Sequence, residues 1–174
     1  MAIYTSLIGT VKSSAPLPPE CKIKVQASPA HLMKSGFNIP VTITSASMVR
    51  EMAHDKDFKS ITVMAHFDTG ASKTNIDLHI AEIIELSAVG ISKTYTASGP
   101  TEMPEYAIDL SFPGSELQPF SNLRVGSCKL PFQPGQSSPM FLSNSNIGVL
   151  IGRDIMSKWN IVWNGPTSTV FISD

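Results

Sequence analysis

One acidic residue of this chain stands where a catalytic carboxylate would be expected. Residues 61–67 form a mainly apolar run that leads directly into Asp68, Thr69 and Gly70. An acid at the end of a buried strand costs stability unless the side chain is used. The triplet occurs once, since the 174 residues contain no second Asp-Thr-Gly or Asp-Ser-Gly. Acid or base chemistry at Asp68 is the first hypothesis, and a turn without function is the alternative.

The composition indicates a folded chain without a charged partner. A length of 174 residues suits one domain, and 42% of them are hydrophobic while 16% are charged. The net charge of −1 gives no reason to expect nucleic acid or an anionic membrane as a partner. The chain starts without a basic region, and no apolar stretch reaches the roughly 20 residues that span a bilayer. We therefore expect no membrane segment and a cytoplasmic protein.

The patterns of cofactor and metal sites are missing from the sequence. Cys21 and Cys128 lie far apart, and the four histidines follow no metal-binding spacing. The sequence also has no phosphate-binding glycine loop and no Gly-x-Ser-x-Gly motif. We expect no metal and no cofactor. The two cysteines are interpreted as thiols in a reducing compartment, with their redox state left open.

The first half of the chain predicts strands around one amphipathic helix. Strands are expected at residues 22–25, 39–44 and 61–67, and residues 50–59 are expected to be a surface loop or a short helix. After the acid, isoleucines recur at helical spacing from Ile76 to Ile84. Asn75 is the expected N-cap of this helix, and Gly90 is expected just beyond its end.

The second half predicts more strands than helices. The strands are expected at residues 93–97, 101–112, 117–130, 147–152, 161–163 and 168–172. A turn at residues 98–100, a polar loop at 133–146 and a short helix at 153–159 interrupt them. Short strands with one or two short helices predict the all-β class.

The order of these features resembles the retropepsin-like aspartic proteases, which are single-domain relatives of pepsin. The resemblance lies in the segment Ala-His-Phe-Asp-Thr-Gly-Ala-Ser at 65–72 and in Val-Leu-Ile-Gly-Arg-Asp at 149–154. It covers residues 39–174 and implies a closed β-barrel domain. Residues 1–38 are then an N-terminal extension, read as a propeptide, an extra strand or a tether, with self-processing near 29–36 as one hypothesis. A β-barrel with a chance triplet is the alternative.

The resemblance implies hydrolysis of peptide bonds by a water held between two carboxylates. One carboxylate acts as the base while the other donates a hydrogen bond. Two unit charges about 3 Å apart repel by roughly 5 kcal/mol at an effective dielectric of about 20, so such a pair retains one proton. Because the chain has one Asp-Thr-Gly, the second carboxylate is expected from Asp68 of a second copy. We therefore predict an obligate homodimer acting on an extended polypeptide.

The family also implies roles for the neighbours of Asp68. Thr69 is expected to hydrogen-bond across the two-fold axis, and Gly70 to let another backbone approach closely. Tyr95–Met103 matches the flap that closes over the substrate, although it reads equally as an ordinary hairpin, and Pro100 departs from the glycine-rich retroviral tip. The residues expected to bind substrate are His66, Ala71, Ser72, Ala97, Ser98 and Gly99. For His66, a core histidine is the alternative.

Gly152, Arg153 and Asp154 are predicted to support the active-site loop structurally. In the family this arginine commonly meets an acid soon after Asp-Thr-Gly-Ala, but here that position is taken by Ser72 and Lys73. Arg153 is therefore expected to turn to Asp77 or Asp154. This departure and Pro100 favour an alternative function, a catalytically silent dimerisation or peptide-binding module of the same fold.

Overall fold

The protein is mostly β, as predicted. The computed structural model describes residues 2–5, 22–26, 29–53, 58–96, 99–134 and 146–174. Within these ranges the strands are β1 (Ala2–Thr5), β2 (Ile23–Gln26), β3 (Asn38–Ser45), β4 (Ser60–Phe67), β5 (Asn75–Asp77), β6 (Ala88–Thr96), β7 (Gly99–Ser111), β8 (Phe120–Cys128), β9 (Ile147–Ile151), β10 (Asn160–Asn164) and β11 (Thr169–Ser173). The helices are α1 (Pro29–Ser35), α2 (Ser47–Ala53), α3 (Leu78–Ile83) and α4 (Arg153–Met156).

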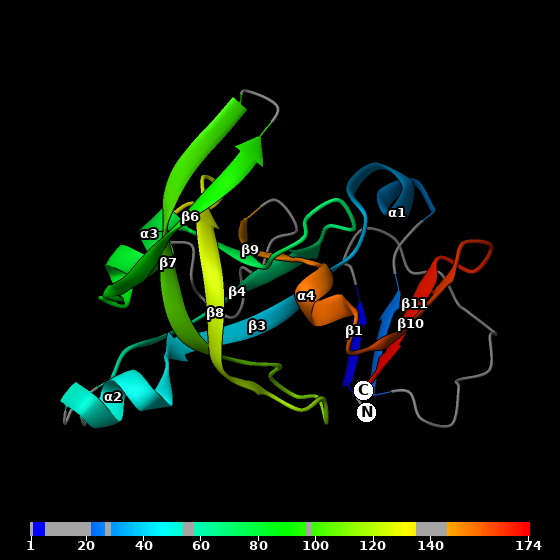
Figure 1. Cartoon of the computed structure of the whole chain (residues 1–174). Coiled ribbons are helices and arrows are strands. Elements are labelled where there is room, and N and C mark those ends of the chain that lie inside the picture. The colour runs from blue at the N-terminus through cyan, green and yellow to red at the C-terminus, as the bar shows by residue number, and fades with distance from the viewer. Residues whose placement is uncertain (1, 6–21, 27–28, 54–57, 97–98, 135–145) are drawn as a thin grey trace.

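Six strands close into a barrel. They are hydrogen-bonded in the order β3, β4, β9, β5, β8 and β7, and a further pairing of β3 with β7 completes the ring. Among the described residues, β6 pairs with β7 alone in this sheet, and the two form a hairpin that stands away from the barrel (Figure 1). The closed barrel expected from the sequence is confirmed.

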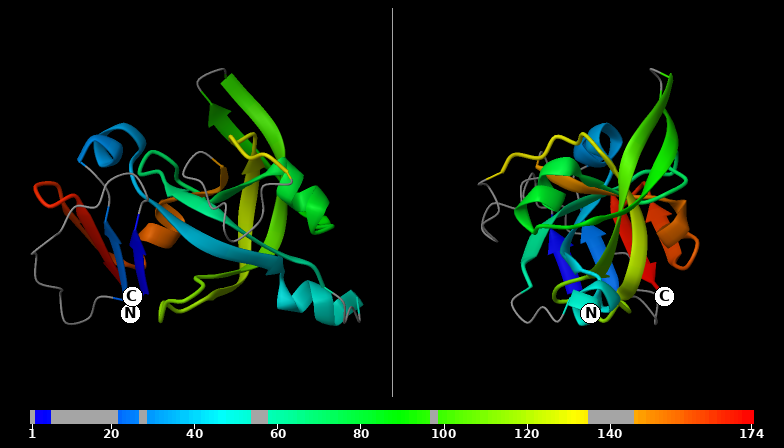
Figure 2. Two further views of the ribbon diagram at one scale, coloured as in Figure 1. Left: turned by 180° about the vertical axis from the view of Figure 1, so that it is seen from behind. Right: turned by 60° about the vertical axis from the view of Figure 1, so that its left-hand side comes forward.

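A second sheet lies beside the barrel, on the side away from α2. This arrangement is visible both in Figure 1 and in the view from behind in Figure 2. Its strand order is β1, β2, β11 and β10. The predicted closing hairpin is confirmed as β10 and β11, which pair from Asn160 with Ser173 to Asn164 with Thr169. β2 is antiparallel to β11, so residues 23–26 join the C-terminal hairpin. The domain boundary at residue 38 stays a prediction.

Alternation of side chains along the strands places one face of the barrel sheet in the core. Phe67 at the end of β4 is 7% exposed, and its ring stacks on Phe37 with centroids 4.2 Å apart. Trp159, after α4, packs against Phe67 at 6.0 Å and Phe112 at 5.1 Å. Phe67 directly precedes Asp68, so this aromatic cluster fixes the end of β4.

The predicted helix after the acid begins later than expected, and its predicted cap is wrong. Asn75 and Ile76 belong to β5, where they pair with Leu150 and Val149 of β9. Ile76 is fully buried as a strand residue. The helix α3 starts after Asp77, whose carboxylate accepts a 2.9 Å hydrogen bond from the His79 backbone N–H. Strand pairing on both sides of β5 outweighs the local helical pattern.

Other element boundaries also differ from the predictions, and the helix expected at 153–159 ends at Met156. Gly90 lies inside β6 and does not follow the end of the helix, because β6 begins at Ala88 to pair with β7. The strand expected at 117–130 spans Phe120–Cys128. Residues 50–59 were expected to be a surface loop or a short helix, and residues 50–53 form the end of α2, Ser47–Ala53. In the described residues, none of the helices is long and apolar enough to cross a membrane.

Candidate active site

Asp68 follows β4 at the point where the strand leaves the barrel, and its backbone continues the ladder. The Asp68 N–H donates to the Ile151 carbonyl of β9 at 3.0 Å. Asp68 is a half-buried residue, and its carboxylate accepts the Gly70 N–H at 2.8 Å. A Cβ on Gly70 would lie 3.0 Å from Asp68 Oδ1, so a side chain there would crowd the carboxylate. The local sequence thus holds one carboxylate in a fixed orientation at a strand end.

The residues predicted around Asp68 share one loop, between β4 and β5. Ala71 is half-buried and its N–H donates to the Asp68 carbonyl at 3.1 Å, which closes the turn. Thr69, Gly70 and Ser72 are exposed. An exposed loop around a half-buried acid leaves room for a partner chain on this surface.

α4 braces this loop through a residue that the sequence analysis did not single out. Thr74 is fully buried, and its hydroxyl donates to Asp154 Oδ1 at 2.8 Å. The same hydroxyl accepts the Gly152 N–H at 3.1 Å, and the Thr74 N–H donates to Asp154 Oδ2 at 3.0 Å. Gly152 approaches so closely that a Cβ would lie 2.5 Å from the Lys73 carbonyl carbon. The glycine and the acid of the second motif thus both contact Lys73 or Thr74, at the end of the Asp68 loop.

Arg153 braces the loop by a different contact from the one predicted. Its guanidinium donates to the Thr69 carbonyl, and its backbone N–H donates to the Ala71 carbonyl at 2.9 Å. The carboxylates expected as partners are bound elsewhere: Asp154 accepts from Thr74, and Asp77 accepts from His79 and from the Leu130 N–H. A carbonyl acceptor thus replaces the carboxylate, and the arginine still holds the loop next to Asp68.

His66 points toward the segment after α1. Its Nδ1 lies 2.8 Å from Asn38 Oδ1, and a Cβ on Gly36 would meet the imidazole Cε1 at 2.9 Å. Burial lowers the pKa of His66, and the negative charge of Asp68 offsets part of that shift. The neutral imidazole is therefore favoured in the fold. A role of His66 in binding substrate stays a prediction.

The predicted flap coincides with the tip of the β6–β7 hairpin. Thr96 pairs with Gly99 across the tip, and Gly99 has φ of +111°, a conformation that suits glycine. Ala97 and Ser98 lie outside the described residues. The hairpin is present, and its closure over a substrate stays a prediction.

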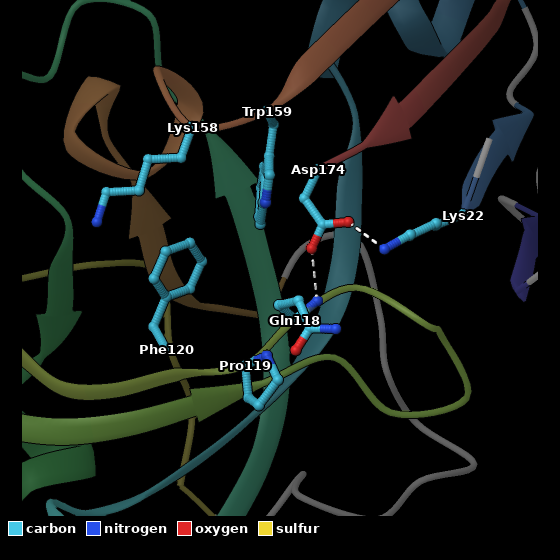
Figure 3. A pocket seen from close by; sticks show the side chains of 7 residues that line it. All are labelled: Lys22, Gln118, Pro119, Phe120, Lys158, Trp159 and Asp174. Carbon is cyan, nitrogen blue, oxygen red and sulfur yellow. Dashed lines mark hydrogen bonds and ion pairs between the residues drawn. The ribbon is translucent and has the colours of Figure 1, made fainter. Parts of the chain in front are cut away.

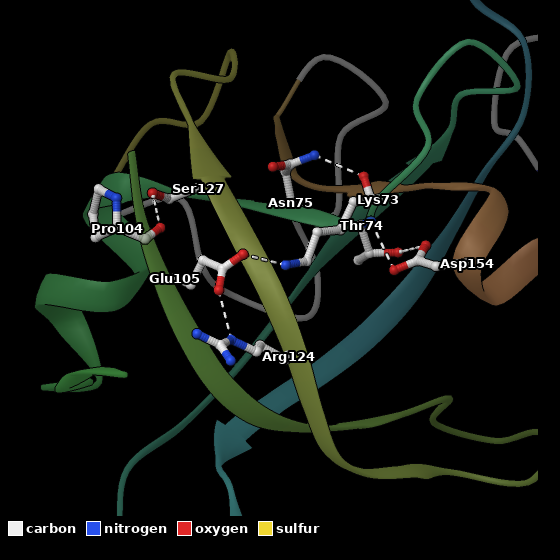
Figure 4. A network of polar contacts seen from close by, with 8 residues as sticks. All are labelled: Lys73, Thr74, Asn75, Pro104, Glu105, Arg124, Ser127 and Asp154. Atoms are coloured by element: carbon white, nitrogen blue, oxygen red, sulfur yellow. Dashed lines mark hydrogen bonds and ion pairs between the residues drawn. The ribbon is translucent and has the colours of Figure 1, made fainter. Parts of the chain in front are cut away.

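A buried carboxylate connects the hairpin to the Asp68 loop, and sequence reasoning missed it. Glu105 of β7 is 7% exposed; one carboxylate oxygen binds Lys73 Nζ and the other binds Arg124 Nε (Figure 4). The hydrogen bond from Lys73 is the main cause that lowers the pKa of Glu105. The only available signal was the alternation in β7, which puts Glu105 on the face opposite the apolar residues.

A hollow of about 370 Å³ lies elsewhere, between the start of β8 and the end of the chain (Figure 3). Trp159 and Phe120 form its walls, and Asp174 at its edge accepts from Lys22 and from the Gln118 N–H. None of the predicted site residues lines it. Within the described residues, no group of three His, Cys, Asp or Glu side chains could hold a metal ion.

Comparisons with known proteins give similar structures. No family model and no curated protein matches the chain. A retropepsin-like aspartic protease from Rickettsia conorii is 13% identical, with a TM-score of 0.41, over 78% of this chain and 89% of that chain. A foamy viral protease-reverse transcriptase in complex with an RNA/DNA hybrid is 13% identical, with a TM-score of 0.40, over 71% of this chain. The match spans 12% of the viral chain. The function proposed below therefore rests on the residues of this chain.

Proposed function

We propose that the protein is an aspartic-type endopeptidase whose active unit is a homodimer, with Asp68 of each copy flanking the attacking water. The observation that carries this proposal is the orientation of Asp68. This half-buried residue lies at a strand end, and its carboxylate is held by the Gly70 N–H at 2.8 Å in a loop braced by Arg153 and Thr74. A fixed carboxylate is what general acid–base catalysis requires.

A second copy is inferred from the other buried and half-buried carboxylates of the described residues. One carboxylate cannot both take a proton from water and donate a hydrogen bond to the carbonyl being attacked. Asp77, Glu105, Asp109 and Asp154 are each bound to partners of their own. A two-fold axis beside the exposed residues of the loop would bring two Asp68 side chains together, where they would share one proton.

In this proposal the described residues position the reaction and carry its protons. One Asp68 removes a proton from water as the water attacks the peptide carbonyl, while the protonated partner donates to the carbonyl oxygen. The proton taken from the water then passes from that Asp68 to the leaving nitrogen as the C–N bond breaks, and the partner recovers its proton from the carbonyl oxygen. The Gly70 N–H holds Oδ1 of each Asp68 carboxylate, which leaves Oδ2 for the water and the substrate. The β6–β7 hairpin would cover the peptide and exclude bulk water.

The test is cleavage of an unfolded polypeptide between pH 4 and pH 7 by wild type and by Asp68→Asn. We expect the variant to lose at least about 10³-fold in rate while it keeps the size and circular dichroism of wild type. Asp174→Asn is the matched control, because it makes the same change at the edge of the hollow in Figure 3, and we expect it to keep its activity.

Subunit mixing tests the shared site directly. If each site needs both Asp68 residues, then adding excess Asp68→Asn protein to wild type lowers the activity, because mixed dimers are inactive. An active monomer at micromolar concentration, or activity unaffected by the variant, would refute the shared site. A folded dimer that cleaves nothing at any pH would favour the silent binding module.

A further inference from the structure

The face of the barrel sheet that carries Asp68 continues without interruption to the Glu105 ion cluster. Residues paired across neighbouring strands project to the same side of a sheet. His66, two residues before Asp68, pairs with Leu150, and Leu150 pairs with Asn75. Asn75 in turn pairs with Gly126 of β8. Arg124 lies two residues from Gly126 and pairs with Ala107, two residues from Glu105.

The side chains that pack over two glycines agree with this shared face. A Cβ on Gly126 would lie 2.3 Å from Asn75 Oδ1 and 3.8 Å from Ser92 Oγ. A Cβ on Gly90 would lie 2.2 Å from an Arg124 terminal nitrogen and 3.4 Å from Glu105 Oε2. The β6–β7 hairpin therefore contributes to the same face, and Gly90 of β6 and Gly126 of β8 leave room for polar side chains.

The ion cluster on this face has two cations for one carboxylate. Lys73 and Arg124 both bind Glu105, so the cluster has an excess of one positive charge. The Glu105 side chain is 9% exposed, whereas the Lys73 and Arg124 side chains are 35% and 58% exposed. Figure 4 shows Lys73 and Arg124 each bound to a different oxygen of Glu105. The buried anion thus orients two cations that solvent, or a ligand, can reach.

The position of Lys73 ties this charge to the candidate active site. It is five residues after Asp68, in the loop that Thr74 and Asp154 fix. An extended peptide that lies across Asp68 and under the hairpin would run along this face, with alternate side chains pointing toward it.

We propose that Lys73 and Arg124, held by Glu105, form a specificity subsite for an acidic side chain of the polypeptide, a few residues from the bond that is cut. This inference rests on the proposed function and names its substrate class. A carboxylate of the substrate would accept hydrogen bonds from the cations that Glu105 holds in place. A glutamine at the same substrate position would bind the two cations more weakly, because its amide is neutral. A lysine there would be repelled by them.

The experiment compares matched peptides that carry Glu, Gln or Lys at each position around one scissile bond. At one position we expect Glu to exceed Gln by about tenfold in kcat/KM. Arg124→Gln should remove most of this preference. The matched control is Lys93→Gln, because Lys93 is paired with Glu102 on the opposite face of the hairpin and should leave the preference unchanged. Lys73→Gln serves as the second variant where Arg124→Gln does not fold.

Salt gives a readout that needs no variant. Raising NaCl to about 1 M shortens the Debye length to about 3 Å, so the preference of the wild type should shrink. Cleavage without a preference for Glu, or a preference that both Arg124→Gln and Lys73→Gln retain, would overturn the subsite and leave the peptidase standing. If wild type cleaves no peptide, the proposed function fails instead. Peptide binding by folded Asp68→Asn then decides the subsite: tighter binding of Glu than Gln supports it, and equal binding refutes it.

Discussion

Thr74→Val removes one hydroxyl that joins the Asp68 loop to the start of α4. That hydroxyl donates to Asp154 Oδ1 at 2.8 Å and accepts the Gly152 N–H at 3.1 Å, in a fully buried position. A hydrogen bond to a charged group contributes about 1.5–3 kcal/mol, and a neutral one about 0.5–1.5 kcal/mol. Asp154 keeps the Thr74 and Ile155 N–H donors, so its charge stays partly compensated. We expect a loss of about 2–4 kcal/mol in the free energy of unfolding.

The assay is urea unfolding of wild type and variant at equal protein concentration, because a dimer's stability depends on concentration. With an unchanged slope, the midpoint should fall by on the order of 1–2 M. Thr62→Val is the matched control, because its hydroxyl makes one hydrogen bond, 2.8 Å to Thr42 Oγ1, in a half-buried position. It should cost about 0.5–1.5 kcal/mol. Equal losses for Thr74→Val and Thr62→Val would refute the bracing of the loop by this hydroxyl.

Two further substitutions test the supports of the site. Gly152→Ala should destabilise the fold by about 1–3 kcal/mol or more, because the new Cβ would lie 2.5 Å from the Lys73 backbone, which cannot swing away. Gly165→Ala, whose nearest neighbour would be a tryptophan nitrogen at 4.0 Å, should change unfolding by less than about 0.5 kcal/mol. Glu105→Gln removes the charge that binds Lys73 and Arg124 and should lower the free energy of unfolding by about 1–2 kcal/mol above pH 4.5. The loss is limited because solvent screens the two cationic partners.

The pH dependence of Glu105→Gln follows from the direction of the pKa shift. The pKa of Glu105 lies below its ordinary value of 4.5 in the folded state, so the unfolded chain binds its proton at a higher pH. The ion pairs stabilise the fold fully above pH 4.5 and lose their effect as the pH falls through the folded pKa. Unfolding curves measured from pH 6 to pH 3 should therefore converge for variant and wild type. A constant difference across this range would contradict the role of the charge.

The sequence by itself determined the local elements and the two motifs. The strands at 39–44, 61–67 and 147–152 and the closing hairpin were predicted correctly, since alternation and turn residues are local properties. The Asp-Thr-Gly triplet and Gly-Arg-Asp were identified as a loop and its support, and the structure places them in contact. A short motif after a buried strand carries this information because the backbone there has few conformations available.

Only the tertiary structure decided which distant residues complete the site. Asn75 reads as a helix cap, yet it is a strand residue because β9 and β8 pair with it from more than 50 positions away. Likewise Glu105 reads as an outward-facing acid, and the fold buries it between Lys73 and Arg124. Contacts of this kind depend on how strands close into a barrel. Local propensity does not predict how the barrel closes, because the stability of the closed barrel comes from pairings between segments far apart in the chain.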